Sequence, residues 1–225
     1  MADSLPGDPG SGDAAAGDAG ARPLIAVLDY GIGNLRSAQK AFEHVGADAR
    51  LTADLGDIEA ADAVVLPGVG AFGACMDALR SCGLDTVALD VVASGRPFMG
   101  ICVGMQMMYA SSDEDPGAAG LAIFDRPIHL LPDTVKRPQM QWNRLVAKDP
   151  DHPMLRGLVD PWVYFVHSYA AEGGDEVVAT CDYGIDVTAA VARDNVWATQ
   201  FHPEKSADAG LAILRNFLTW AGELT

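Results

Sequence analysis

The sequence is poor in basic residues. Its 225 residues contain 15 Lys and Arg against 31 Asp and Glu, so the formal net charge is −16 with His neutral. Non-specific binding to DNA or RNA needs clustered Lys and Arg, and so does binding to an anionic membrane surface. The composition therefore argues against both functions. It favours partners that are neutral, basic or locally matched in charge.

Long apolar runs and paired cysteines are also missing. The longest stretch without a charged side chain, residues 97–112, is interrupted by Pro97, Gly100 and Gln106, whereas a membrane span needs about 20 apolar residues. No basic region followed by an apolar one marks a secretory signal. Four cysteines without a C-x-x-C pair indicate neither a disulfide scaffold nor a zinc knuckle. We therefore expect a cytoplasmic protein with free thiols.

Residues 1–22 differ in composition from the rest of the chain. Ala, Gly, Asp and Pro dominate this stretch, and Leu5 is its only larger apolar residue after Met1. Such a stretch buries too little apolar surface to offset the entropy lost on ordering. We predict a disordered tail at residues 1–22 and one folded domain at residues 23–225.

Apolar runs alternate with helical patterns in the first half of the domain, which predicts an α/β fold with a mainly parallel sheet. Strands are expected at residues 24–28, 49–51, 63–66 and 97–101, and helices at residues 34–44, 76–79, 84–94 and 103–109. The second half predicts strands at residues 123–131, 144–146 and 162–169, and a final helix at residues 209–220. Antiparallel strands near an edge are expected at residues 176–181, 188–193 and 196–200.

Cys102 stands in a motif typical of a nucleophile. The run Gly100-Ile101-Cys102-Val103-Gly104 places it between small residues at the junction of a predicted strand and a predicted helix. The helix N-terminus beside the sulfur favours the thiolate, and the Val103 N–H can face a developing oxyanion. The alternative is a buried structural cysteine, which we expect for the other three: Cys75, Cys82 and Cys181.

A cysteine nucleophile needs a base, and His202 is the strongest of the five His candidates. It follows a predicted strand, and Glu204 stands two residues further on, where it can orient the imidazole and stabilise its cation. His167 alternates within a predicted strand, so it is expected in the core or at a cavity wall. The others lie in expected surface positions: His44, His129 and His152.

The order of these residues along the chain disfavours an α/β-hydrolase. That fold runs nucleophile, acid, then His, whereas here the well-placed acid follows its His. Asp182 or Asp186 could still serve as an intervening acid in an enzyme of the dienelactone-hydrolase type.

A glycine-rich turn at residues 67–73 follows a predicted strand and could offer a backbone N–H to an oxyanion. The alternatives are a phosphate loop and a plain tight turn. Neither Gly-Lys-Ser/Thr nor G-x-G-x-x-G is present after a strand, so nucleotide binding is not supported.

Together these segments resemble the class I (triad-type) glutamine amidotransferases, and more specifically the glutaminase subunits of imidazole glycerol phosphate synthase in histidine biosynthesis. The elbow around Cys102 and the His-Pro-Glu run are shared by the whole class. Two segments are more specific to this subunit: Asp29-Tyr30-Gly31-Ile32-Gly33-Asn34-Leu35 and Tyr164-Phe165-Val166-His167-Ser168-Tyr169. The resemblance extends from about residue 23 to the end. It implies a three-layer α/β/α, flavodoxin-like fold with a mainly parallel central sheet and extra antiparallel strands.

The resemblance implies a role for each matched residue. Cys102 attacks the glutamine amide, His202 shuttles the proton and Glu204 holds His202. Three further groups match family positions: oxyanion residues (Val69, Gly70 and Val103), residues that contact glutamine (Gln106, Ser168 and Tyr169) and residues that face a partner (Trp142, Asn143, Tyr164 and Lys205). Neither a metal nor a cofactor is implied.

The implied partner is a (β/α)8-barrel cyclase that forms a heterodimer with this chain and receives the ammonia. The cyclase would convert a phosphoribulosyl-formimino aminoimidazole carboxamide nucleotide into imidazole glycerol phosphate and an aminoimidazole carboxamide nucleotide. A glutaminase without an acceptor wastes glutamine, so we expect low basal activity that rises when the partner and its ligand bind. Val69 matches the residue whose peptide turns to complete the oxyanion hole.

One segment departs from the family pattern. The usual Pro-His-Met-Gly-Trp-Asn is Pro138-Gln139-Met140-Gln141-Trp142-Asn143 here, and we expect it to differ in detail yet still bind a cyclase. Two other interpretations stay open. One is another class I amidotransferase, such as the glutaminase of pyridoxal phosphate synthase or of anthranilate synthase. The other is a partner-binding regulatory paralogue with weak glutaminase activity.

Overall fold

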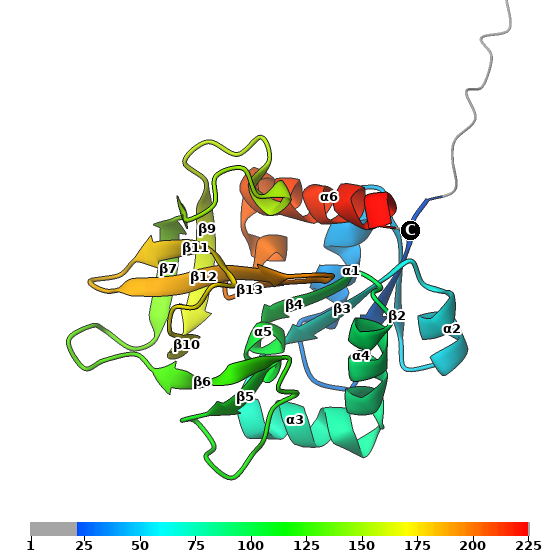
Figure 1. Cartoon of the computed structure of the whole chain (residues 1–225), viewed down its shortest axis with the longest axis horizontal. Coiled ribbons are helices and arrows are strands. Elements are labelled where there is room, and N and C mark those ends of the chain that lie inside the picture. The colour runs from blue at the N-terminus through cyan, green and yellow to red at the C-terminus, as the bar shows by residue number, and fades with distance from the viewer. Residues whose placement is uncertain (1–21, 225) are drawn as a thin grey trace, which may run out of the picture.

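An eight-stranded sheet runs through the middle of the molecule (Figure 1). The structure is a computed structural model that describes residues 22–224, so the predicted tail lies outside the described residues apart from Arg22. In spatial order the strands are β2 (Asp48–Thr52), β1 (Leu24–Leu28), β3 (Ala63–Gly68), β4 (Phe98–Cys102), β13 (Val196–Thr199), β12 (Asp186–Arg193), β11 (Val177–Asp182) and β8 (Val146–Ala147). The first five are parallel, and the last three pair in antiparallel fashion.

Helices cover both faces of the sheet, which gives three layers (Figure 1). On one face α1 (Leu35–His44) packs against α6 (Ala207–Leu224), and on the other α3 (Phe72–Ser81) packs against α4 (Leu84–Ala93). The short helix α5 (Val103–Met107) follows β4 directly. None of the helices within residues 22–224 combines the length and the apolar character that a membrane crossing requires.

Two small sheets and two 3₁₀ turns complete the described part of the chain. One sheet has the order β10 (Tyr169–Ala171), β6 (Phe124–Leu130) and β5 (Tyr109–Ser112). The other pairs β7 (Gln139–Arg144) with β9 (Trp162–His167). Both lie on the side of the molecule opposite α2 (Leu55–Ala60) and β2 (Figure 1). The 3₁₀ turns are η1 (Pro153–Leu155) and η2 (Pro203–Lys205).

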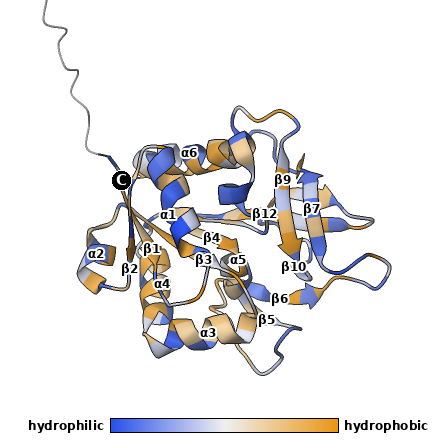
Figure 2. Ribbon diagram, turned by 180° about the vertical axis from the view of Figure 1, so that it is seen from behind, coloured by the Kyte–Doolittle hydropathy of each residue, from blue (hydrophilic) through white to orange (hydrophobic). Residues whose placement is uncertain are grey.

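The central strands are apolar because both of their faces are covered. All residues of β3 and β4 are buried, and Figure 2 shows how hydrophobic β1 and β3 are. A parallel sheet between two helical layers requires such continuous apolar runs. Helix α6 is anchored by aromatic stacking, with the ring centroids of Trp197 and Trp220 4.4 Å apart.

The structure confirms the predicted α/β class and most of the predicted elements, and it corrects several. Residues 196–200 were expected near an edge, but β13 lies inside the sheet, parallel to β4. Residues 103–109 do not form one helix, because α5 ends at Met107 and Tyr109 starts β5. Helix α2 was not predicted. The strand expected at residues 144–146 is divided between two strands: Arg144 ends β7, which pairs with β9, and Val146 starts β8, which pairs with β11.

Candidate active site

Cys102 sits at the sharp turn from β4 into α5. Its backbone has φ 57° and ψ −112°, a positive φ that is rare for a residue other than glycine. The turn requires close backbone approach, because a Cβ on Gly104 would lie 1.8 Å from the carbonyl oxygen of Leu66. This is the strained strand-to-helix geometry that the Gly-x-Cys-x-Gly motif predicts.

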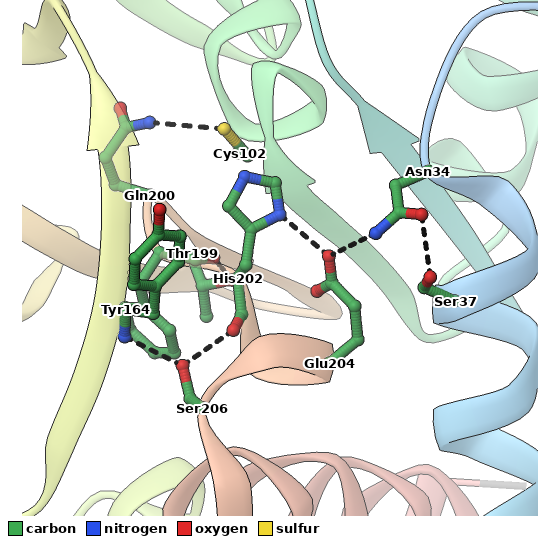
Figure 3. Close-up of polar contacts among 10 residues, drawn as sticks. Asn34, Ser37, Cys102, Tyr164, Thr199, Gln200, His202, Glu204 and Ser206 are labelled. Atoms are coloured by element: carbon green, nitrogen blue, oxygen red, sulfur yellow. Dashed lines mark hydrogen bonds and ion pairs between the residues drawn. The ribbon is translucent and has the colours of Figure 1, made fainter. Parts of the chain in front are cut away.

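His202 lies between Cys102 and Glu204 (Figure 3). Its Nδ1 is 2.7 Å from Oε1 of Glu204, and the other ring nitrogen faces the Cys102 sulfur. Both side chains of the His–Glu pair are almost fully buried, with exposed fractions of 2% and 3%. An imidazole held between a thiol and a carboxylate can take a proton from the thiol while the carboxylate stabilises the resulting cation.

The surroundings of His202 favour its charged form. Burial alone would lower the pKa of the imidazole, but hydrogen bonds to Cys102 and Glu204, together with their charges, outweigh burial and raise the pKa to about 9. The imidazolium is therefore the favoured form at neutral pH.

Two contacts that the sequence did not predict support this pair. Asn34 Nδ2 donates to Glu204 Oε1 at 3.4 Å, and Ser37 Oγ donates to Asn34 Oδ1 at 2.7 Å (Figure 3). Asn34 is the N-cap residue of α1, but its side chain makes no cap hydrogen bond. The sequence signal was the Asp29–Leu35 segment, which marked the family without assigning Asn34 a role.

The backbone of His202 is tied to strand β9. Ser206 Oγ donates to the His202 carbonyl oxygen at 2.6 Å and accepts the Tyr164 N–H at 2.9 Å (Figure 3). Ser206 is fully buried. Tyr164 was predicted to face a partner, so this serine links a predicted partner-facing strand to the imidazole.

A cavity of about 600 Å³ opens beside Cys102 and His202. It brings together most of the residues predicted for the site, namely Cys102, His202, Val69, Gly70, Val103, Gln106, Ser168, Tyr169 and Lys205. Glu204 lies behind His202 and outside this lining. The other three predicted partner-facing residues are also outside it: Trp142, Asn143 and Tyr164.

Gln106 contributes to the cavity floor through an internal network. It is buried, and its Nε2 donates to the Tyr169 carbonyl oxygen at 2.9 Å and to Gln200 Oε1 at 3.1 Å. Gln200 Nε2 in turn lies 3.9 Å from the Cys102 sulfur (Figure 3). Two of the three predicted glutamine-contacting residues, Gln106 and Tyr169, are thus connected to the Cys102 sulfur through Gln200.

Glu114 is a cavity residue that the sequence did not predict. Glu114 belongs to the acidic loop that follows β5, yet its side chain is half-buried and lines the cavity. Its Oε2 accepts the N–H of Phe72 at the start of α3, at 2.8 Å. No local pattern separates Glu114 from its acidic neighbours, since only the packing of the loop against α3 turns it inward.

His167 lines the cavity with a neutral imidazole. Burial lowers the pKa of its imidazole to about 4. Nδ1 lies 2.9 Å from the Tyr169 carbonyl oxygen, so that nitrogen carries the proton. The opposite nitrogen, Nε2, is buried without a hydrogen-bond partner. His167 therefore lies at the cavity wall, as its alternation within the strand predicted.

The predicted partner-facing residues are spread over β7, β9 and η2. Trp142 is 45% exposed and its ring centroid is 6.1 Å from that of Tyr164. Asn143 Nδ2 donates to the Asp182 carbonyl oxygen at 2.7 Å. Lys205 is exposed at the cavity mouth.

The two glutamines that depart from the family pattern differ in burial. Gln139 is fully buried, and its Nε2 lies 3.4 Å from the Cys181 sulfur. Gln141 is exposed. The change at position 139 is therefore internal, and the change at position 141 alters the surface.

Two expectations about other residues are corrected. Cys75 and Cys181 are buried as expected, but Cys82 is exposed because it caps the C-terminal end of α3. Asp182 and Asp186 are exposed, and Glu204 already occupies Nδ1 of His202, so neither aspartate acts as the acid of a hydrolase triad.

No cluster of three or more potential metal ligands occurs within residues 22–224.

Comparison with known proteins agrees with this geometry. The family model for class-I glutamine amidotransferases matches residues 26–220. The imidazole glycerol phosphate synthase subunit HisH of Methanothermobacter thermautotrophicus is 50% identical over 196 residues, which cover 87% of this chain and 98% of that protein. The HisH protein of Acinetobacter baylyi is 47% identical over 201 residues, with coverage of 87% and 98%.

Solved structures show the same fold. A crystal structure of a glutamine amidotransferase matches with a TM-score of 0.71 at 22% identity, covering 88% of this chain and 98% of that one. The structure of PurLQS from Thermotoga maritima matches with a TM-score of 0.65 at 19% identity, covering 88% and 99%. The family match, the identity to the HisH subunits and the shared fold lead to one assignment: the chain belongs to the class-I glutamine amidotransferase family, in the group of HisH subunits of imidazole glycerol phosphate synthase.

Proposed function

We propose that this chain hydrolyses the side-chain amide of glutamine and delivers the ammonia to a (β/α)8-barrel cyclase subunit. The observation that carries the proposal is the buried His202, 2.7 Å from Glu204 and facing Cys102, at the wall of a cavity of about 600 Å³. The HisH relatives are subunits of imidazole glycerol phosphate synthase by name. Their identity of about half over nearly their whole length supports the same role here.

Cys102 is the proposed nucleophile. Its sulfur attacks the γ-carbonyl carbon of glutamine, and His202 holds the thiol proton and passes it to the departing nitrogen, which leaves as ammonia. The product on the enzyme is a γ-glutamyl thioester. Water, deprotonated by His202, then attacks the thioester and releases glutamate with the free thiol.

Backbone N–H groups at Val69, Gly70 and Val103 are the proposed oxyanion donors. Each attack on a carbonyl places negative charge on its oxygen, which preorganised donors stabilise by about 3–4 kcal/mol each. All three residues line the cavity beside Cys102.

A carboxylate in the cavity suits the α-ammonium group of free glutamine. Glu114 lines the cavity with a carboxylate that has no cationic side chain bonded to it in the described part of the chain, so we assign it to the α-ammonium group. Ser168 and Tyr169 line the same cavity, and Gln106 donates to the Tyr169 carbonyl oxygen; these three residues are the proposed contacts for the rest of the substrate.

The surface beside the cavity suits a protein partner. Met140, Trp142 and Trp162 expose large apolar side chains on β7 and β9, with exposed fractions of 61%, 45% and 55%. Exposed apolar surface of this kind marks interaction sites. Lys205 adds a positive charge at the cavity mouth. We propose that Trp142, Asn143, Tyr164 and Lys205 contact the cyclase, which supplies the binding site for the phosphorylated substrate.

Replacing the nucleophile separates the two half-reactions. Cys102→Ala should abolish glutamine-dependent product formation by the complex with the cyclase, because no thioester can form. Ammonia-dependent synthesis should persist, since the cyclase site is intact. The measurement is product formation with glutamine and, separately, with ammonium salt. Cys82→Ala, which removes an exposed thiol, should retain both activities. Loss of the ammonia-dependent reaction in Cys102→Ala would contradict the proposed division of labour.

Removing the charge of Glu204 should shift the pH dependence. The imidazolium of His202 is present below its pKa of about 9 and is lost as pH rises through that value. Glu204→Gln removes one interaction that raises this pKa. The decrease of kcat on the alkaline side of its pH profile should therefore occur at lower pH. We expect kcat to fall by roughly 10²- to 10⁴-fold. The control is Glu223→Gln, an exposed carboxylate near Arg156. If kcat of Glu204→Gln decreases at the same alkaline pH as kcat of the parent, Glu204 does not stabilise the imidazolium.

The charge of Glu114 should matter for substrate binding. Glu114→Gln keeps an acceptor for the Phe72 N–H but loses the attraction to the α-ammonium group. The KM for glutamine should therefore rise roughly 10- to 100-fold, with a much smaller change in kcat. Asp113→Asn is the matched control, because this neighbouring carboxylate lies 3.1 Å from His129 and outside the cavity lining. Equal KM values for the two variants would refute the assignment.

A further inference from the structure

Two buried side chains, those of Tyr30 and Cys75, donate hydrogen bonds to the backbone of the glycine-rich turn at residues 67–73. The Tyr30 hydroxyl donates to the Pro67 carbonyl oxygen at 2.7 Å, and the Cys75 thiol donates to the Val69 carbonyl oxygen at 3.3 Å. Both side chains are buried, with exposed fractions of 6% and 0%. The two acceptors are two residues apart, so the peptides before and after the Gly68–Val69 peptide are each fixed by one side chain.

This turn lies directly beside the nucleophile. Gly68 is in register with Cys102 across the β3–β4 pair, and Val69 and Gly70 line the cavity. Gly70 has φ +96° and open space where a Cβ would stand, so the backbone there is free to adopt conformations closed to other residues. A change in peptide orientation in this turn therefore changes which backbone groups face the cavity.

Cys75 is suited to act as a fixed donor. Burial raises the pKa of its thiol, so the S–H proton is retained at neutral pH. Its side chain is not among those that line the cavity beside Cys102. Its own backbone is held at the start of α3, where the Cys75 N–H donates to the Ala71 carbonyl oxygen at 3.0 Å and the Phe72 N–H donates to Glu114.

We propose that the Cys75 thiol is a positioning residue for the oxyanion site, because it fixes the Val69 carbonyl while Tyr30 fixes the Pro67 carbonyl. Reorientation within the turn is then confined to the Gly68–Val69 peptide. The inference rests on the proposed glutaminase function and adds to it a residue that touches neither substrate nor reacting atoms. Without the thiol, the Val69–Gly70 peptide also rotates, and the oxyanion donors spend less time in the orientation that the transition state needs.

The kinetic test compares variants in the complex with the cognate cyclase and its nucleotide ligand. Cys75→Ala should lower kcat for glutamine hydrolysis by about 3- to 10-fold and change KM by less than about 2-fold, as expected for loss of one weak orienting hydrogen bond. Cys75→Ser retains a donor and should recover most of the loss. Cys181→Ala removes an equally buried thiol from β11 and should leave kcat unchanged. An unaltered kcat in Cys75→Ala, or an equal loss in Cys181→Ala, overturns the proposal.

Two further measurements separate this role from damage to the fold or to the nucleophile. Alkylation of Cys102 by iodoacetamide, followed by mass spectrometry of its peptide, forms no oxyanion, so its rate should be the same in Cys75→Ala and the parent. Amide hydrogen exchange over residues 67–72 should be faster in Cys75→Ala than in Cys181→Ala. If exchange in Cys75→Ala is unchanged, the proposed role of Cys75 is overturned, even if the parent protein hydrolyses glutamine. If exchange is faster in Cys75→Ala but the parent protein does not hydrolyse glutamine, the positioning role of Cys75 is supported and the proposed function is refuted.

Discussion

The hydrogen bond between His202 and Glu204 is the contact on which the site depends. A carboxylate with 3% exposure is costly to bury unless it is paired and hydrogen-bonded. Here it is paired with an imidazole whose pKa is raised to about 9, and Asn34 adds a second donor. The imidazolium and the carboxylate therefore stabilise each other in the buried site, and the carboxylate favours the charged form of the imidazole that faces Cys102. Together with Cys102, Glu204 raises the pKa of the imidazole against the effect of burial, which by itself favours the neutral form.

The sheet topology brings Cys102, His202 and the glycine-rich turn close together. Strand β13 pairs in parallel with β4, so His202 and Cys102 emerge from the same edge of the sheet although 100 positions separate them. Strand β3 pairs with β4 on its other side and ends in the glycine-rich turn at that same edge. Ligands of open α/β sheets bind outside the carboxyl ends of the strands, and this cavity follows that rule. The position of β13 between β4 and β12 thus brings His202, the proposed base, beside Cys102, the proposed nucleophile.

The sequence predicts the site best where function depends on local chain geometry. The elbow at Cys102 and the two-residue spacing from His202 to Glu204 are local patterns, and the structure has the corresponding turn and hydrogen bond. Asn34 lies 170 positions from Glu204, so no periodicity or motif reports that contact. Glu114 and Cys75 likewise depend on how α3 packs against a loop. The central position of β13 depends on which strands pair, and an apolar pattern does not encode that choice. Gln139 turns inward because it faces β11, although it stands in a segment matched to the partner surface.

Labelling with a diazoketone analogue of glutamine tests the central claim most directly, because the reagent enters the glutamine site and alkylates only a nucleophile placed at the amide carbon. We predict one adduct, located on Cys102 by peptide mass spectrometry, with labelling slowed by free glutamine and absent in Cys102→Ala. An adduct on the exposed Cys82 in preference to Cys102, or labelling that glutamine does not slow, would contradict the account.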